Sequence, residues 1–309
     1  MKRLLFSVSL LVLLLCSCEL VPLDEGRIVH IAIGLSYRGC DVQSLPASIN
    51  DAVEVSQAFT ELFAEKVFLS ELLVQRGVQD RHGMWVYEGG SSDEIPTKER
   101  VLERLTYWIS FLSASDLLII TYSGHGLEDG SLVLAPSGED GFMFLDDWSV
   151  DPSLLLGPDE LFSLLSRSRA AVFLILDSCY SGNFVHDGVS TISITDQRDI
   201  FADAYRCYFG DASYRRGVFV LSATSSDHTS SEPLAGSHTH GYFTAALLEG
   251  LGWDCSRQHL VTRRPFISSD WLYGYILSHQ RIPASGEHGL WYQHPQISGG
   301  PLDLVLISR

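Results

Sequence analysis

Three continuous apolar segments of strand length lie in the middle of this sequence, and they constrain its fold more than any other feature. They are residues 116–122, 170–176 and 218–223, and apolar side chains occupy successive rather than alternating positions in them. A strand of this composition is buried on both faces, as in a parallel sheet covered by helices on each side. Because a helical pattern separates the first two segments and further helical patterns precede and follow all three, the sequence predicts a mainly parallel α/β sheet with helices on both faces.

The remaining elements continue this alternation. A β-branched apolar run at 27–35 predicts a first strand, and residues 48–63 predict a helix with Ser48 as its N-cap. We expect four more helices, at 97–112, 158–166, 242–251 and 268–278. We also expect two short strands, at 84–88 and 302–307. The polar, aperiodic segment 186–216 is expected to form a surface loop. Since no linker divides the body, we expect one domain over residues 27–309.

The first residues have the pattern of a targeting segment. Lys2 and Arg3 precede an apolar run of twelve residues, which is shorter than the roughly 20 residues of a membrane-spanning helix. The following Leu15-Cys16-Ser17-Cys18 resembles a bacterial lipobox, with Cys18 at the modified position. We interpret residues 1–17 as a lipoprotein signal peptide and residues 18–26 as a tether. The protein would then be lipid-anchored to a membrane of the bacterial cell envelope, outside the cytoplasm. The alternatives are an ordinary secretory signal and an uncleaved anchor.

Composition narrows the classes of partner. The chain of 309 residues has 21 Lys and Arg against 38 Asp and Glu, a formal net charge of −17. A surface this acidic repels phosphate backbones, so we expect no nucleic-acid partner, whereas cationic substrates would be attracted. Six cysteines are too few for a disulfide framework in a chain of this length, and nothing in the sequence selects a pair.

Two of the predicted strands end in residues capable of chemistry. His125 lies between two glycines directly after the 116–122 segment, and Cys179 follows the 170–176 segment. Glycine permits close backbone approach, and ligands in such sheets bind outside the carboxyl ends of the strands. Taken singly, the histidine could be structural and the cysteine an inert buried side chain. Together at one sheet edge, they indicate nucleophilic catalysis by a thiol with an imidazole partner.

These two segments also carry a family resemblance. Tyr-Ser-Gly-His-Gly at 122–126 and Asp-Ser-Cys-Tyr-Ser-Gly at 177–182 resemble the caspase-like cysteine peptidases, and specifically the metacaspases. Further similarities extend over most of the chain, at residues 34–37, 45–53, 219–223, 232, 240–250 and 293–296. The resemblance implies a caspase-like, flavodoxin-like sheet and a cysteine endopeptidase.

The resemblance also assigns roles to individual residues. Cys179 would be the nucleophile and His125 its catalytic partner, while the backbone amides of Cys179 and Gly126 would form the oxyanion hole. An acidic S1 pocket would be formed by Asp51, Ser123 and Asp177. Two carboxylates in one pocket repel each other unless a cation is bound, so the substrates would be peptides or proteins with Arg or Lys at P1.

The sequence leaves a calcium requirement and two other functions as alternatives. Many metacaspases bind calcium through acidic residues that include an Asp-Asp-Glu sequence, but this chain has Pro158-Asp159-Glu160 there and lacks one oxygen ligand. We therefore expect no required cofactor and keep calcium as an alternative. The chain could also be a catalytically silent caspase-fold binding or scaffold module, or a different hydrolase or transferase that uses Cys and His.

Overall fold

A six-stranded sheet forms the centre of the molecule, with the strand order β13-β9-β8-β5-β1-β2. The computed structural model describes residues 26–89, 94–185, 217–233, 239–280, 293–298 and 304–308. The predicted signal peptide, Cys18 and the 186–216 loop lie outside these residues. Five strands are parallel, namely β1 (Ile28–Leu35), β2 (Phe68–Gln75), β5 (Leu117–Ser123), β8 (Ala171–Asp177) and β9 (Val218–Ser222). The edge strand β13 (Gln296–Ser298) pairs antiparallel with β9.

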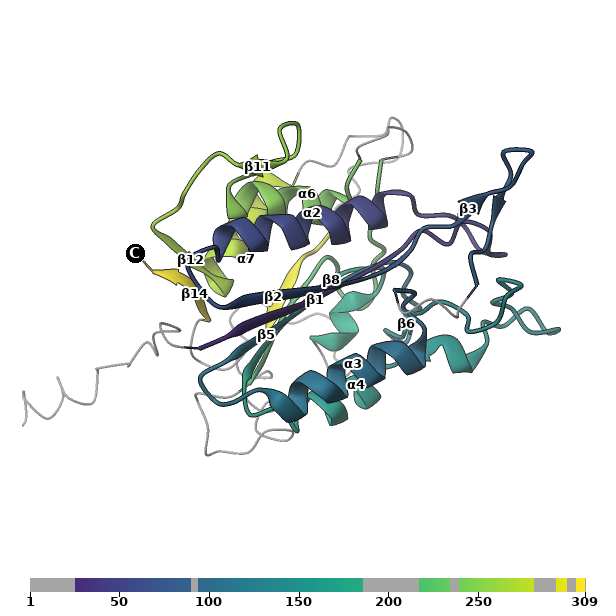
Figure 1. The fold of residues 1–309 in the computed structure, drawn as a ribbon, viewed down its shortest axis with the longest axis horizontal. Coiled ribbons are helices and arrows are strands. Elements are labelled where there is room, and N and C mark those ends of the chain that lie inside the picture. The colour runs from purple at the N-terminus through teal and green to yellow at the C-terminus, as the bar shows by residue number, and fades with distance from the viewer. Residues whose placement is uncertain are drawn as a thin grey trace, which may run out of the picture.

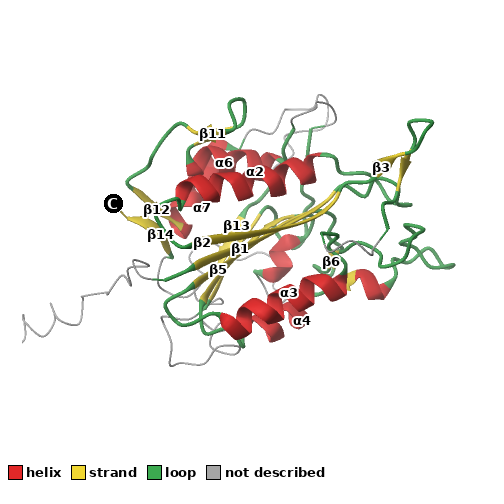
Figure 2. Cartoon of the chain, viewed as in Figure 1, coloured by secondary structure: helices red, strands yellow, loops and turns green. Residues whose placement is uncertain are grey.

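Helices cover both faces of this sheet, as predicted (Figures 1 and 2). One face carries α2 (Ala47–Leu62), α6 (Tyr242–Leu251) and α7 (Ser269–His279), and the other carries α3 (Lys98–Phe111) and α4 (Pro158–Leu165). Alternate residues of one strand therefore enter different cores. Along β5, Leu117 and Ile119 pack with α2 and α6, whereas Leu118 and Ile120 pack with α3 and α4.

Short strands and 3₁₀ turns lie outside the six-stranded sheet. They are β3 (Val78–Gln79), β4 (Trp85–Val86), β6 (Leu132–Val133), β7 (Leu155–Leu156), β10 (Trp253–Asp254), β11 (His259–Leu260), β12 (Phe266–Ser268), β14 (Val305–Ser308), and the 3₁₀ turns at Pro152–Leu154 and Ser181–Phe184. Two predictions need correction here. The strand expected at 84–88 is the two-residue β4, which pairs with β3, and the last strand pairs with β12. Neither belongs to the central sheet.

The start of α2 also differs from the prediction. The helix begins at Ala47 with Pro46 at the N-cap position, and no side chain caps it. Ser48 is buried inside the first turn, where its carbonyl oxygen would lie 2.7 Å from a Cβ at Gly34. The first turn of α2 thus packs directly on β1. Within the described ranges, no helix combines the length and the apolar character needed to cross a bilayer.

Candidate active site

The carboxyl ends of β5 and β8 bring the two candidate catalytic residues to one edge of the sheet. The parallel register pairs Ser123 with Asp177, the last residue of each strand. Just beyond, the Gly124 amide donates to the Asp177 carbonyl oxygen at 3.3 Å. The chain then leaves both strands side by side, so His125 and Cys179 each lie two residues past a paired position.

The glycines on either side of His125 are required by close packing. A Cβ on Gly126 would lie 2.1 Å from the Cys179 carbonyl oxygen, which is closer than real Cβ contacts allow. A Cβ on Gly124 would lie 2.7 Å from the hydroxyls of Tyr122 and Tyr37. The segment carrying His125 can therefore rest on the backbone of Cys179 only because residue 126 has no side chain.

The imidazole of His125 is held from several sides. Its Nε2 lies 2.7 Å from the carbonyl oxygen of Gln43, and its ring centroid lies 4.6 Å from that of Tyr37. Since a carbonyl oxygen only accepts hydrogen bonds, Nε2 carries a proton and Nδ1 is the nitrogen free to accept one. Burial lowers the pKa of His125, and the Gln43 carbonyl partly offsets that effect. The ring is thus arranged as a neutral base.

Cys179 is half-buried and remains a thiol at rest. Its Sγ lies 3.7 Å from the Ser230 carbonyl oxygen. Burial raises the pKa of the thiol, and the charge of Asp177 raises it further. Tyr180, the next residue, has a left-handed backbone with φ of 55°, which turns the chain sharply after the cysteine. Among the described residues, no hydrogen bond joins the side chains of His125 and Cys179.

The three residues predicted for the S1 pocket do lie together. Asp51 comes from α2, Ser123 from β5 and Asp177 from β8, and all three are buried. The Ser123 hydroxyl donates to Asp51 Oδ2 at 2.7 Å. The three line one cavity of about 10 Å³, roughly the space of one water.

Hydrogen bonds from two later segments hold Asp177 in place. Ser230 Oγ donates to Oδ1 at 2.6 Å, and the Thr244 hydroxyl and amide donate to Oδ2 at 2.7 and 3.2 Å. Burial and the charge of Asp51 nevertheless raise the pKa of Asp177 to about 6. Glu232 lies close by, and burial with the charges of Asp51 and Asp177 raises its pKa to about 7. A third carboxylate thus lies near the two that line the cavity.

The side chain of His240 supplies a cation to this cluster, a role that was not predicted from the sequence. Its Nδ1 donates to Asp51 Oδ1 at 2.9 Å, and the Gly241 amide reaches the same oxygen at 3.2 Å. Although burial opposes it, contact with Asp51 and Cys255 raises the pKa of His240 to about 10. Asp51 is thus balanced by an imidazolium, whereas Asp177 forms no ion pair among the residues that the structure describes. A signal was available in the His-Gly pair directly before the 242–251 helix.

Among the acidic residues considered for calcium binding, Glu160 already has an ion-pair partner. Glu160, in the first turn of α4, forms an ion pair with Lys98 at 2.7 Å. One carboxylate that the calcium alternative would use is therefore already paired with a cation.

The helix-covered, mainly parallel sheet, with His125 and Cys179 beyond neighbouring strands, agrees with the caspase-like resemblance of the two motifs. The chain belongs to the family described as metacaspase, peptidase C14 domain, whose model matches residues 30–187. That match includes both the His125 and the Cys179 segments. The protein therefore carries a cysteine-type endopeptidase domain, and the predicted α/β caspase-like fold and metacaspase-type family are confirmed.

Similar proteins agree with this assignment. Metacaspase-5 of Trypanosoma brucei brucei is 24% identical over 261 residues, which is 78% of this chain and 48% of that protein, so the chain spans about half of its curated relative. Two crystal structures share the fold, each with a TM-score of 0.50. A Geobacter sulfurreducens protein is 18% identical over 89% of this chain and 94% of its own. Caspase-1 from Spodoptera frugiperda is 15% identical over 93% and 95%.

Proposed function

We propose that this protein is an active, lipid-anchored cysteine endopeptidase that cleaves peptides and proteins after Arg or Lys. One observation carries the proposal: the register of β5 and β8 brings the segments of His125 and Cys179 into backbone contact at the sheet edge. The buried carboxylates lie at the ends of the same strands. Catalytic and specificity groups would thus share one edge.

The reaction would proceed by acyl transfer to the thiol. Cys179 Sγ attacks the scissile carbonyl carbon as His125 Nδ1 takes the thiol proton, and the imidazolium then protonates the leaving amine. Water hydrolyses the resulting thioester and regenerates the thiol. The Gln43 carbonyl holds the ring through Nε2, which leaves Nδ1 for this proton. The amides of Cys179 and Gly126 would stabilise the oxyanion.

The selectivity for basic P1 residues follows from charge. Asp177 lines the pocket and forms no ion pair among the described residues, and Glu232 lies near it. Asp177 Oδ1 accepts only from Ser230, so it retains a lone pair for a donor on the substrate. A guanidinium or ammonium would supply the missing positive charge and favour ionisation of both groups. An acidic P1 side chain would instead add a further negative charge.

The remaining elements of the proposal concern attachment and cofactors. Lipidation at Cys18 would hold the domain at a membrane of the cell envelope, outside the cytoplasm, and residues 18–26 would serve as the tether. We propose that catalysis itself needs no cofactor. Calcium remains the alternative, because related enzymes bind it through acidic residues near the start of α4.

A panel of fluorogenic peptides with Arg, Lys or Asp at P1, assayed with calcium and with a chelator, tests the proposal. Turnover of the Arg and Lys peptides that is lost in Cys179→Ala would support it. Folded protein that cleaves no peptide would favour the silent scaffold. Turnover that survives Cys179→Ala would favour another hydrolase and overturn the nucleophile assignment. A requirement for calcium would replace the cofactor-free reaction.

A further inference from the structure

The side of His240 that faces away from Asp51 has no hydrogen-bond partner. The side chain is only 5% exposed, and its Nδ1 is already bound to Asp51. The other ring nitrogen, Nε2, is buried and forms no hydrogen bond. It lies 3.4 Å from Glu54 Oε1, but without the alignment that a hydrogen bond requires. A buried ring nitrogen thus lies beside a second carboxylate without forming a hydrogen bond to it.

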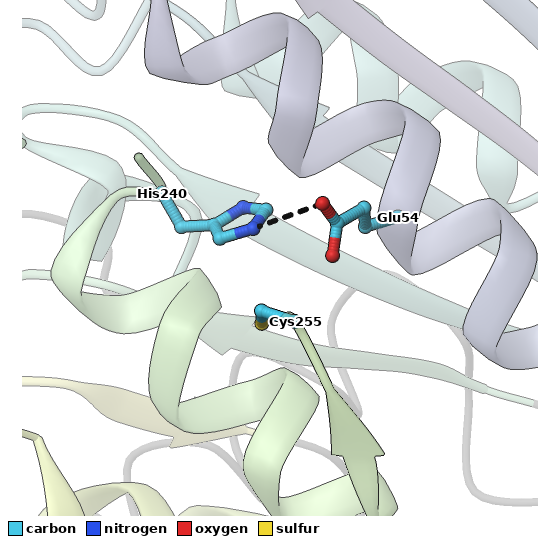
Figure 3. Close-up of side chains that lie close together, drawn as sticks. All are labelled: Glu54, His240 and Cys255. Carbon is cyan, nitrogen blue, oxygen red and sulfur yellow. Dashed lines mark ion pairs between the residues drawn. The ribbon is translucent and has the colours of Figure 1, made fainter. Parts of the chain in front are cut away.

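A thiol completes this cluster. One carboxylate oxygen of Glu54, Nε2 of His240 and Sγ of Cys255 all lie within 4.8 Å of one another. The three residues come from α2, from the segment before α6 and from the turn after β10, and they converge on one point (Figure 3). Glu54 and His240 are buried, while Cys255 is a half-buried free thiol. Three separate elements therefore supply a carboxylate, an imidazole and a thiol.

This set of donors and its spacing suit zinc. Zn²⁺ binds thiolate, imidazole and carboxylate tetrahedrally with bonds of about 2.0–2.3 Å, which places ligand atoms about 3.3–3.7 Å apart. Nε2 and Glu54 Oε1 already have this separation, at 3.4 Å. Sγ needs a shift of about 1 Å or less, which rotation of the Cys255 side chain can supply. Calcium and magnesium prefer oxygen ligands alone and fit poorly.

Neighbouring groups already orient the ligands. The hydrogen bond from Nδ1 to Asp51 fixes the imidazole so that Nε2 faces the cluster, the carboxylate–histidine arrangement that commonly supports a metal. The Trp253 indole donates to Glu54 Oε2 at 2.8 Å and thereby orients Oε1 toward His240. Gln258 also reaches Oε1, at 3.3 Å. Two of the three ligands are thus held before any metal arrives.

We propose that Glu54, His240 and Cys255 form a binding site for Zn²⁺, with the fourth position open to water. The metal takes the place of the proton on Nε2, and Cys255 binds as the thiolate, so its thiol proton is released. The bound ion would tie α2 to the turn after β10 and to the segment that contacts Asp51. This site is separate from Cys179, and its existence does not depend on peptidase activity.

Cobalt spectroscopy on the full chain tests the site. The Cys179→Ala background removes the other thiol at the sheet edge as a competing ligand. Titration with Co²⁺ should give a near-ultraviolet thiolate-to-cobalt band, which Zn²⁺ should abolish by displacement. The band should disappear in Cys179→Ala/Cys255→Ser and persist in the matched control Cys179→Ala/Cys40→Ser. Cys40 suits this purpose because it is also a half-buried free thiol.

Two further measurements keep the proposal testable if Cys255→Ser does not fold. Glu54→Gln retains an acceptor for Trp253 but loses the anionic ligand, so its Zn²⁺ dissociation constant should rise at least about tenfold. In the Cys179→Ala chain, Zn²⁺ should also slow alkylation of Cys255 by iodoacetamide without protecting Cys40, as read by peptide mass. A missing cobalt band, a band that survives Cys255→Ser, or unchanged alkylation of Cys255 would each overturn the proposal.

Discussion

The reacting thiol and its partner give the first prediction at the level of single residues. Cys179→Ala should lower kcat by about 10⁴-fold or more, and His125→Ala should do nearly the same. The double variant should be no worse than either single one, because the two side chains would act as one unit. Initial rates on an Arg peptide measure this, and thermal unfolding confirms that each variant is folded. Additive losses would contradict a shared proton transfer.

The acidic pocket gives the second prediction. Asp177→Asn keeps an acceptor oxygen for Thr244 and can direct its amide nitrogen at Ser230 Oγ, which then accepts, but it removes the charge. A hydrogen bond to a charged group contributes about 1.5–3 kcal/mol, so KM for an Arg peptide should rise roughly tenfold or more. The exposed residue Asp80 supplies the matched control Asp80→Asn, which should leave KM unchanged. If Asp177→Asn cleaved the Arg peptide normally, this carboxylate would have no role in recognising the P1 residue.

The third prediction concerns His30, which makes stability depend on pH. This side chain is fully buried, with Nε2 2.9 Å from the Thr121 hydroxyl, and burial lowers its pKa to about 3. The unfolded chain takes up this proton near pH 6.5. The contribution of His30 to the free energy of unfolding is therefore constant above pH 6.5 and falls as the pH drops toward 3, by up to about 1.4 kcal/mol per pH unit.

Urea denaturation between pH 7 and pH 4 measures this effect. His30→Gln should have a shallower decline than the parent chain, because it removes one proton-binding group from the unfolded state. His82→Gln, at an exposed histidine, serves as the control and should keep the parental slope. Equal slopes for the parent and His30→Gln would show that His30 does not carry the acid sensitivity.

At the level of elements, α3 gives the fourth prediction. Thr97 caps this helix by accepting a hydrogen bond from the Arg100 amide at 3.2 Å. Thr97→Ala should therefore cost about 1 kcal/mol of stability, whereas Thr97→Ser should retain most of the cap. Thermal unfolding compares the three proteins. An alanine variant as stable as the parent would mean that water replaces the cap without loss.

The strands show what an apolar pattern can predict. β1, β5, β8 and β9 were expected because both of their faces are buried. β2 escaped prediction because it is an edge strand and carries Ser70 and Glu71 in its middle. Glu71 ion-pairs with Arg104 and accepts a hydrogen bond from Trp108, so a charge inside this strand is stabilised by α3. Contacts between distant segments fixed this strand, and a local pattern does not reveal them.

The same distinction applies to the candidate site. His125 and Cys179 could be placed from the sequence because both closely follow strands that continuous apolar runs identify. Gln43 and Ser230 could not, since they belong to irregular segments whose positions depend on the packed molecule. For His240 the sequence offered only the His-Gly pair before the 242–251 helix, which does not reveal its contact with Asp51.

At the scale of the whole molecule, the N-terminus gives the fifth prediction. If Cys18 is lipidated, the parent protein should fractionate with membranes and carry an acylated mass. Cys18→Ser should leave the membrane or keep residues 1–17 uncleaved. Detergent partitioning and intact mass distinguish these outcomes, with Cys40→Ser as a thiol control away from the predicted signal. If Cys18→Ser still carried the added acyl mass, lipidation at Cys18 would be ruled out.

The contact between Gly126 and the Cys179 carbonyl has a consequence at the level of the gene. All glycine codons share their first two bases, so any substitution at either base places a side chain at residue 126 or stops translation. Every such side chain begins with a Cβ that the Cys179 backbone leaves no room for. Loss-of-function alleles should therefore arise at codon 126 as well as at codons 125 and 179, although Gly126 has no side chain that could take part in the reaction.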